Sequence, residues 1–328
     1  MSSHQPSRRR VLKGVGGVAA ATALGTAAGV AAAPRAHAVD GLQQIEHQSF
    51  GRMQYYRFKT TALAWNPAVN VLLPDGYTPS KRYPVYYLFH GGAQDFRKFD
   101  LEDHIRDLTV GKQLIIVMPD GGTAGWHGDF AQSSLGVRHY EQFHIHQLIP
   151  WVDATFSTFA EFAGRAVGGF SMGGFGALKF AHVYYGHFAS VSAHSGPANL
   201  RSAANLDIVT HWINVSSLAE SGTFPLYANG PLSPAWNQQF VSRDNPCEHI
   251  DRFRGKRIFL VSGTNQSDVN ERFVFGTQRE FKGLLNGAGI GYTAYELGGA
   301  GDNGGHFVRR DRLVEDINGV VAHLRKAG

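Results

Sequence analysis

Short apolar runs and longer stretches with helical spacing alternate along most of this 328-residue chain. Residues 85–89 and 114–118 are apolar throughout, which predicts strands buried on both faces of a sheet. Further strands are predicted at residues 54–59, 69–73, 167–170, 188–192, 258–261 and 292–297, and helices at residues 140–153, 175–184, 271–285 and 312–324. Strands that alternate with helices predict an α/β fold, with a mostly parallel central sheet flanked by helices on both faces.

One segment, residues 197–245, breaks this alternation. It mixes polar and apolar residues without a clean period and contains Trp212, Trp236 and several Pro and Gly residues. We predict an insertion over the active-site face of the sheet, because open α/β sheets bind ligands beyond the carboxyl ends of their strands. A purely structural excursion is the alternative. With no repeat or long linker elsewhere, residues 39–328 are predicted to form a single domain.

The first 38 residues have the features of an export signal. Arg9 and Arg10 lie in a stretch that matches the twin-arginine pattern, a Gly/Ala-rich run follows, and an A-x-A cleavage site ends at Ala38. We therefore expect the twin-arginine export machinery to carry a protein that is cleaved after Ala38 and secreted. A membrane anchor is the alternative, but the run is less hydrophobic than a Leu-rich spanning helix, so no stable anchor is expected.

Removing this segment changes the charge balance. The chain has 31 Lys and Arg against 26 Asp and Glu, and five basic residues but no acidic residue precede Val39. The mature part therefore has no formal net charge, and its composition gives no support for binding nucleic acid. Because Cys247 is the only cysteine, an internal disulfide is excluded, and a buried, inert thiol is expected there.

A serine between glycines is the first candidate for chemistry. Residues 169–173 read Gly-Phe-Ser-Met-Gly and fit the G-x-S-x-G pattern, in which the serine lies on a sharp turn from a strand to a helix. A predicted strand precedes this stretch and a predicted helix follows it, as the pattern requires. Ser171 is therefore the candidate nucleophile. The alternative is a Gly-rich turn with a solvent-exposed serine that has no catalytic role.

A serine hydroxyl needs a base, and the base needs a carboxylate behind it. In the α/β-hydrolase arrangement the acid follows a strand after the nucleophile and the histidine comes last. Asp268 follows the predicted strand at residues 258–261 and is the preferred acid, with Glu271 as the alternative. His306, the only histidine between Asp268 and the C-terminal helix, is the candidate base.

Two backbone N–H groups are candidates for an oxyanion hole. One donor of such a site is the N–H of the residue after the nucleophile, here Met172, and the other comes from the loop after an earlier strand. His90, Gly91 and Gly92 stand directly behind the apolar run 85–89, and Gly92 is the predicted second donor.

Aromatic side chains near these loops are candidates for a substrate pocket. Phe96, Trp126 and Phe130 are predicted to line an apolar acyl or aryl site, with burial in the core as the alternative. No cofactor or metal is predicted, because His144 and His146 have no carboxylate or cysteine cluster at ligand spacing.

With these residues in place, the chain resembles the esterase D and antigen 85 (mycolyltransferase) group of α/β-hydrolases, and bacterial feruloyl and acetyl xylan esterases. The resemblance spans about residues 55–324. It rests on residues 83–92, 117–122, 169–174, 245–246, 258–263 and 305–306. It implies an α/β-hydrolase fold with a Ser-His-Asp triad, acting through an acyl-enzyme on small-molecule or polysaccharide-linked esters.

Departures from antigen 85 favour hydrolysis over acyl transfer. That group has Asp-Gly-Leu-Arg at the oxyanion loop, where the Asp and Arg help to hold trehalose, whereas this chain has His90-Gly-Gly-Ala and a shorter loop. The paired cysteines of that group are also absent. We therefore expect a secreted serine carboxylic ester hydrolase. An acyltransferase that uses a sugar or glycerol hydroxyl is the first alternative, and a catalytically idle secreted binding protein is the second.

Overall fold

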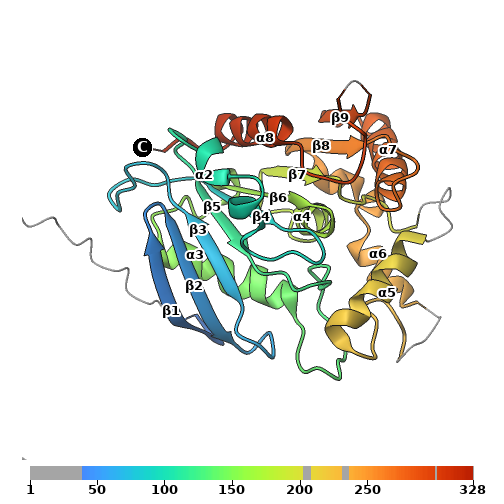
Figure 1. The fold of residues 1–328 in the computed structure, drawn as a ribbon, viewed down its shortest axis with the longest axis horizontal. Coiled ribbons are helices and arrows are strands. Elements are labelled where there is room, and N and C mark those ends of the chain that lie inside the picture. The colour runs from blue at the N-terminus through green and yellow to red at the C-terminus, as the bar shows by residue number, and fades with distance from the viewer. Residues whose placement is uncertain (1–38, 202–207, 231–235, 300, 328) are drawn as a thin grey trace, which may run out of the picture. The chain divides into compact units, whose positions relative to one another are not determined.

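The computed structural model describes residues 39–201, 208–230, 236–299 and 301–327. The predicted export signal, residues 1–38, lies outside the described residues. The described residues contain a nine-stranded sheet with the strand order β1-β2-β3-β5-β4-β6-β7-β8-β9 (Figure 1). The strands are β1 (Leu42–Phe50), β2 (Met53–Thr60), β3 (Ala68–Leu72), β4 (Val85–Phe89), β5 (Ile115–Pro119), β6 (Arg165–Phe170), β7 (Ser190–His194), β8 (Arg257–Gly263) and β9 (Thr293–Leu297).

The sheet is antiparallel at one end and parallel through the rest. β1, β2, β3 and β5 pair in antiparallel fashion, whereas the run β5-β4-β6-β7-β8-β9 is parallel throughout. The predicted α/β fold with a mostly parallel sheet is therefore confirmed. Because parallel strands end at the same edge, the segments that follow β4, β6, β7 and β8 meet there.

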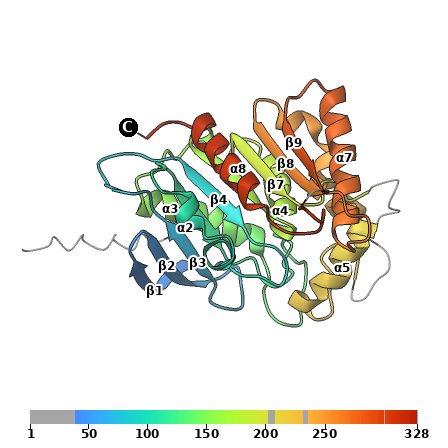
Figure 2. The same cartoon turned by 45° about the horizontal axis from the view of Figure 1, so that its top comes forward.

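Alternate residues of the central strands face two separate cores, as the period of two in a strand requires. On β4, Val85, Tyr87 and Phe89 belong to the core that three helices cover, α3 (Ile149–Thr155), α4 (Met172–Val183) and α7 (Glu271–Gly287). Tyr86 and Leu88 belong to the core under α8 (Arg310–His323). Figure 2 shows α8 over one face of the sheet. The apolar runs are continuous because both faces are covered.

The helices of the described residues include the four that were predicted, with ends close to the predicted ones, and others that were not predicted. They are α1 (Lys98–Leu101), α2 (Ile105–Leu108), the π-helical η1 (Gln142–Leu148), α3 (Ile149–Thr155), the 3₁₀ turn η2 (Phe162–Gly164), α4 (Met172–Val183), α5 (Ile208–Ser221), α6 (Gln238–Asp244), the 3₁₀ turns η4 (Pro246–Glu248) and η5 (Ile250–Phe253), α7 (Glu271–Gly287) and α8 (Arg310–His323). The helix predicted at residues 140–153 is η1 followed directly by α3. No helix in the described ranges is long and apolar enough to cross a bilayer.

The sequence analysis missed one strand. β1 was not among the predicted strands, but it pairs along β2 as the edge strand of the sheet. Its sequence, LQQIEHQSF, is mostly polar, so no run or strict alternation of apolar residues marks it as a strand. The segment 197–245, predicted as an insertion, contains α5 and α6, and α5 reaches the carboxyl edge of the parallel strands.

Candidate active site

The turn between β6 and α4 carries Ser171 at the carboxyl edge of the sheet. Ser171 has φ 54° and ψ −117°, a strained conformation for an L residue. The turn can be this tight because Gly173 has no Cβ; one built there would lie 2.2 Å from the carbonyl oxygen of Phe89 on β4. The N–H of Ser171 donates to the carbonyl of His194 at 2.9 Å, which fixes the turn to the end of β7.

His306 lies between Ser171 and Glu271. Its Nε2 is 2.8 Å from Ser171 Oγ, and its Nδ1 is 2.6 Å from Glu271 Oε2. Because a carboxylate only accepts hydrogen bonds, these partners assign the proton to Nδ1 and leave Nε2 to accept from the Ser171 hydroxyl. The ring of Phe170 packs 5.0 Å from the imidazole. The order hydroxyl, imidazole, buried carboxylate is the geometry that activates a serine.

Asp268, the predicted acid, does not contact the imidazole, so this prediction is wrong and the alternative, Glu271, occupies the place. Asp268 Oδ1 accepts from the N–H groups of Asn270 and Glu271 at 2.9 and 3.0 Å. Its Oδ2 accepts from the backbone N–H of His306 at 3.0 Å. Asp268 therefore binds the first turn of α7 and the His306 main chain, while Glu271, the first residue of α7, extends to the ring.

The pKa of Asp268 reflects these backbone contacts. Partial burial raises it, but donations from the N–H groups of Glu271, His306 and Asn270 outweigh burial and hold the pKa below its ordinary value. The carboxylate is thus kept charged next to the main chain of the histidine loop. Its role here is to position this loop.

In the loop after β4, the N–H group of Gly92 is unengaged and lines the cleft at Ser171. The neighbouring N–H groups donate within the protein: Gly91 to Gln94 Oε1 at 2.9 Å and Ala93 to Thr123 O at 2.8 Å. In the described part of the chain, the N–H of Gly92 has no acceptor. Met172 begins α4, so its N–H has no partner within the helix. The structure thus brings both predicted oxyanion donors to the cleft that holds Ser171.

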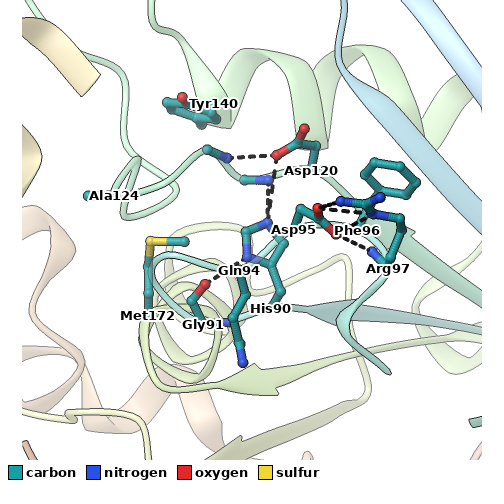
Figure 3. Close-up of polar contacts among 12 residues, drawn as sticks. His90, Gly91, Gln94, Asp95, Phe96, Arg97, Asp120, Ala124, Tyr140 and Met172 are labelled. Atoms are coloured by element: carbon teal, nitrogen blue, oxygen red, sulfur yellow. Dashed lines mark hydrogen bonds and ion pairs between the residues drawn. The ribbon is translucent and has the colours of Figure 1, made fainter. Parts of the chain in front are cut away.

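The buried side chain of His90 fixes this loop to the loop after β5 (Figure 3). Nε2 accepts from the N–H of Gly121 at 2.8 Å, so Nδ1 carries the proton and donates to the carbonyl of Gly91 at 2.8 Å. Farther along, the N–H of Ala124 donates to Glu220 Oε1 at 3.0 Å, and Tyr140 donates to Oε2 at 2.6 Å. Since Glu220 belongs to α5, this contact also ties α5 to the loop.

An apolar cleft of about 410 Å³ opens at Ser171. It is lined by Gly92, Ala93, Thr123, Ala124, Trp126, Phe170, Ser171, Met172, Trp212, Ser216, Ala219, Asn270 and His306. Trp212, Ser216 and Ala219 share one face of α5, at positions i, i+4 and i+7. Trp126 joins the two walls, because its Nε1 donates to Ser216 Oγ at 2.9 Å and its ring lies 5.1 Å from that of Trp212.

A second cleft, of about 510 Å³, adjoins the first; its lining includes several charged side chains, and we call it the polar cleft to distinguish it from the apolar one. The two share Ala93 and Thr123, which belong to the loops beside the candidate oxyanion site. The polar cleft is further lined by Trp65, Gln94, Asp95, Arg97, Lys98, Leu101, Glu102, Asp120 and Gly122. Arg97 folds back on Asp95 in an ion pair (Figure 3). An apolar and a polar space thus meet beside Ser171.

The structure separates the three aromatic residues predicted for the substrate pocket. Trp126 lines the apolar cleft. Phe130 is buried in the core and Phe96 lines a groove beside Tyr55, so neither belongs to the cleft and both predictions are wrong. Trp212 was overlooked as a lining residue; its spacing with Ser216 and Ala219 was the available signal.

His144 and Cys247, the other candidates for chemistry, have partners within the protein. His144 is buried 3.3 Å from His127 through their Nδ1 atoms, and burial lowers its pKa to about 4. The described residues contain no group of three or more His, Cys, Asp or Glu that could hold a metal ion. Cys247 donates to the carbonyl of Ala198 at 3.2 Å, and burial raises its pKa above the ordinary value.

Solved structures define the class of protein to which this fold belongs. An S-formylglutathione hydrolase from Agrobacterium tumefaciens superposes with a TM-score of 0.66 at 16% identity, over 86% of this chain and 99% of that chain. MPT51 of Mycobacterium tuberculosis gives a TM-score of 0.66 at 16% identity, over 85% and 99%. The fold is therefore the α/β-hydrolase fold, as predicted.

Sequence comparison narrows the class to a family. The family model "Putative esterase" matches residues 60–306, and the chain belongs to this esterase family. Esterase Rv1288 of Mycobacterium tuberculosis is 54% identical over 298 residues, which cover 88% of this chain and 63% of that protein. The chain thus spans less than two thirds of the length of this relative.

Proposed function

We propose that this protein is a secreted serine carboxylic ester hydrolase that acts through an acyl-enzyme. The observation that carries the proposal is the 2.8 Å contact between His306 Nε2 and Ser171 Oγ, at the mouth of an apolar cleft and next to two unengaged N–H groups. The esterase family of the chain supports the same chemistry.

The first step forms the acyl-enzyme. Ser171 Oγ attacks the ester carbonyl while His306 Nε2 takes the hydroxyl proton, and Glu271 stabilises the imidazolium through Nδ1–H. The N–H groups of Gly92 and Met172 bind the oxyanion of the tetrahedral intermediate. When this intermediate collapses, the C–O bond to the alcohol breaks and His306 returns the proton to the departing alcohol.

The second step releases the acid. Water attacks the acyl carbon, His306 accepts a proton from that water, and the bond to Ser171 breaks as the serine regains the proton. Every proton that moves passes through Nε2. The fixed tautomer of His306 is therefore required in both steps.

The two clefts suggest where the acyl part and the alcohol part of the ester bind. The apolar cleft suits the acyl chain, and the polar cleft, beyond Ala93 and Thr123, suits a hydroxylated alcohol. The same polar space favours a second candidate function, acyl transfer, since a sugar or glycerol hydroxyl held there could replace the attacking water. Turnover of an ester distinguishes both functions from the role of a catalytically idle binding protein.

Hydrolysis of p-nitrophenyl esters from acetate to palmitate, by the mature protein and by Ser171→Ala, tests the proposal. We expect free acid as the main product and loss of nearly all activity in the variant. Mainly acylated acceptor, with glycerol or trehalose added, would establish the transferase. If the protein reacted with no activated ester and no serine-directed phosphonate, a catalytically idle binding protein would be the remaining function.

Secretion is proposed from the sequence of residues 1–38 alone. Replacing Arg9 and Arg10 by lysine should retain the protein inside the producing cell, because the twin-arginine pathway reads this pair. Equal amounts of both forms in the culture medium would contradict this proposal.

A further inference from the structure

The end of β7 contacts both the candidate nucleophile and its carboxylate. The carbonyl of His194 accepts the N–H of Ser171 at 2.9 Å. The next residue, Ser195, donates its hydroxyl to Glu271 Oε1 at 3.0 Å. Ser195 and Glu271 are both fully buried, so water does not compete for this contact.

The two oxygens of Glu271 have separate partners. Oε1 accepts from Ser195 Oγ and from the backbone N–H of Gly263 at the end of β8, and Oε2 accepts from His306 Nδ1. A buried carboxylate group needs hydrogen-bond donors for both of its oxygens, because they replace the water from which it has been removed. The donors on Oε1 also fix the rotation of the carboxylate, because a rotation that moves Oε1 would move Oε2 away from the imidazole.

The backbone at Ser195 is held in an unfavourable conformation. Its φ is 48°, in the left-handed region that glycine adopts freely and that is strained for residues with a Cβ. The N–H of Ser195 donates to the carbonyl of Val261 at 2.7 Å, and Gln278 Nε2 donates to the carbonyl of Gly196 at 3.0 Å. A glycine at position 195 would relieve the strain, so what the serine adds is its hydroxyl.

We infer that Ser195 is a positioning residue for the proposed hydrolysis, which acts by holding Glu271 Oε2 against His306 Nδ1. The inference rests on the proposed function. It assigns no contact with the substrate to Ser195, because this residue does not line the cleft. Loss of its hydroxyl should therefore slow the chemical step and leave substrate binding unchanged.

Ser195→Ala and Ser195→Gly test this inference together. Each should lower kcat for a p-nitrophenyl ester roughly 10-fold, since one hydrogen bond to a charged group is lost, with KM within about twofold of wild type. The glycine variant should be the more stable of the two to heat, because it relieves the positive φ. A kcat of Ser195→Gly equal to that of wild type would overturn the inference, as would a loss confined to KM.

A double-mutant cycle with Glu271→Ala separates positioning from a general effect on the fold. If Ser195 acts only through Glu271, removing its hydroxyl in the Glu271→Ala background should change the residual kcat by less than about twofold. A second loss of roughly 10-fold in that background would contradict the inference. Absence of Ser171-dependent activity in the wild type would instead contradict the proposed function.

Discussion

Two sets of serine, histidine and carboxylate can be compared in the described part of the chain, and in one of them the groups are in the order that catalysis needs. In the first, His306 lies between Ser171 and Glu271, with contacts of 2.8 and 2.6 Å. In the second, Ser192 donates directly to Asp316 Oδ1 at 2.6 Å, and His194 Nε2 contacts Asp316 Oδ2 at 3.1 Å.

The difference lies in the order of the groups and in what surrounds them. In the second set the carboxylate is the centre, and Arg257 at 2.8 Å and the Tyr86 hydroxyl at 2.7 Å complete its shell. The histidine there cannot take a proton from the serine, because the serine proton is donated to Asp316. A buried Ser, His and Asp together therefore stabilise a fold, whereas catalysis needs the imidazole between the other two and an open cleft.

Serine replacement should give the largest contrast between the two sets. Ser171→Ala should lower kcat at least about 10⁴-fold, because the nucleophile is lost. Ser192→Ala should keep kcat within about threefold but lower the free energy of unfolding by about 1.5–3 kcal/mol, since it removes a hydrogen bond to a buried charge. Ester hydrolysis and thermal unfolding of both variants check this; a large loss of kcat in Ser192→Ala with an intact fold would contradict it.

The stability that Asp316 provides should depend on pH. Burial raises the pKa of Asp316, but His194, Arg257 and Ser192 outweigh burial and lower it to about 2. A carboxyl group whose pKa is lowered on folding stabilises the protein above its unfolded pKa, and this contribution is lost as the pH falls toward 2. Asp316→Asn should therefore cost about 3–5 kcal/mol at pH 7.

Denaturant unfolding of wild type and Asp316→Asn at several pH values measures this effect. The difference in unfolding free energy should be constant near neutral pH and shrink below about pH 4, where Asp316 begins to protonate in the unfolded chain. A difference that grows as the solution is acidified would show that the carboxyl group does not have a lowered pKa.

Replacing a residue in the cleft wall that α5 contributes should have a smaller effect on kcat/KM. The size of this effect should depend on the length of the acyl chain. Trp212→Ala removes apolar surface from the cleft, so kcat/KM for the octanoate ester should fall roughly 10-fold, and that for the acetate ester by no more than about twofold. Trp236→Ala is the matched control, because Trp236 packs on the core and does not line the cleft. Equal losses for both esters would mean that α5 does not bind the acyl chain.

Much of the fold could be predicted from the sequence because its signals are local. A strand that is covered on both faces gives a continuous run of apolar residues in the sequence. β4 (Val85–Phe89), for example, has the bounds that were predicted for it. The turn at Ser171 was recognisable because glycines are needed where β6, α4 and β4 approach one another closely. His306 could be chosen because no other histidine lies in that part of the chain.

The choice between the two acids and most of the lining of the apolar cleft could not be predicted, since they depend on side-chain direction. Asp268 and Glu271 lie three residues apart, and only the start of α7 decides which one caps the helix and which one reaches the imidazole. Trp126 and Phe130 are both aromatic and close in sequence, yet one lines the cleft and the other is in the core. The edge strand β1 was missed because most of its residues are polar and no apolar alternation marks it.

The central claim, that Glu271 and not Asp268 supports His306, is tested most directly by kcat at neutral pH for Glu271→Gln and Asp268→Asn. In Glu271→Gln, the amide oxygen would accept from Gly263 and Ser195, so the NH₂ group would face Nδ1 and favour the wrong tautomer. We expect a loss of about 10³–10⁴-fold for this variant. For Asp268→Asn, which keeps a helix-capping oxygen, we expect less than about 10-fold. The reverse ranking, in two folded variants, would contradict the account.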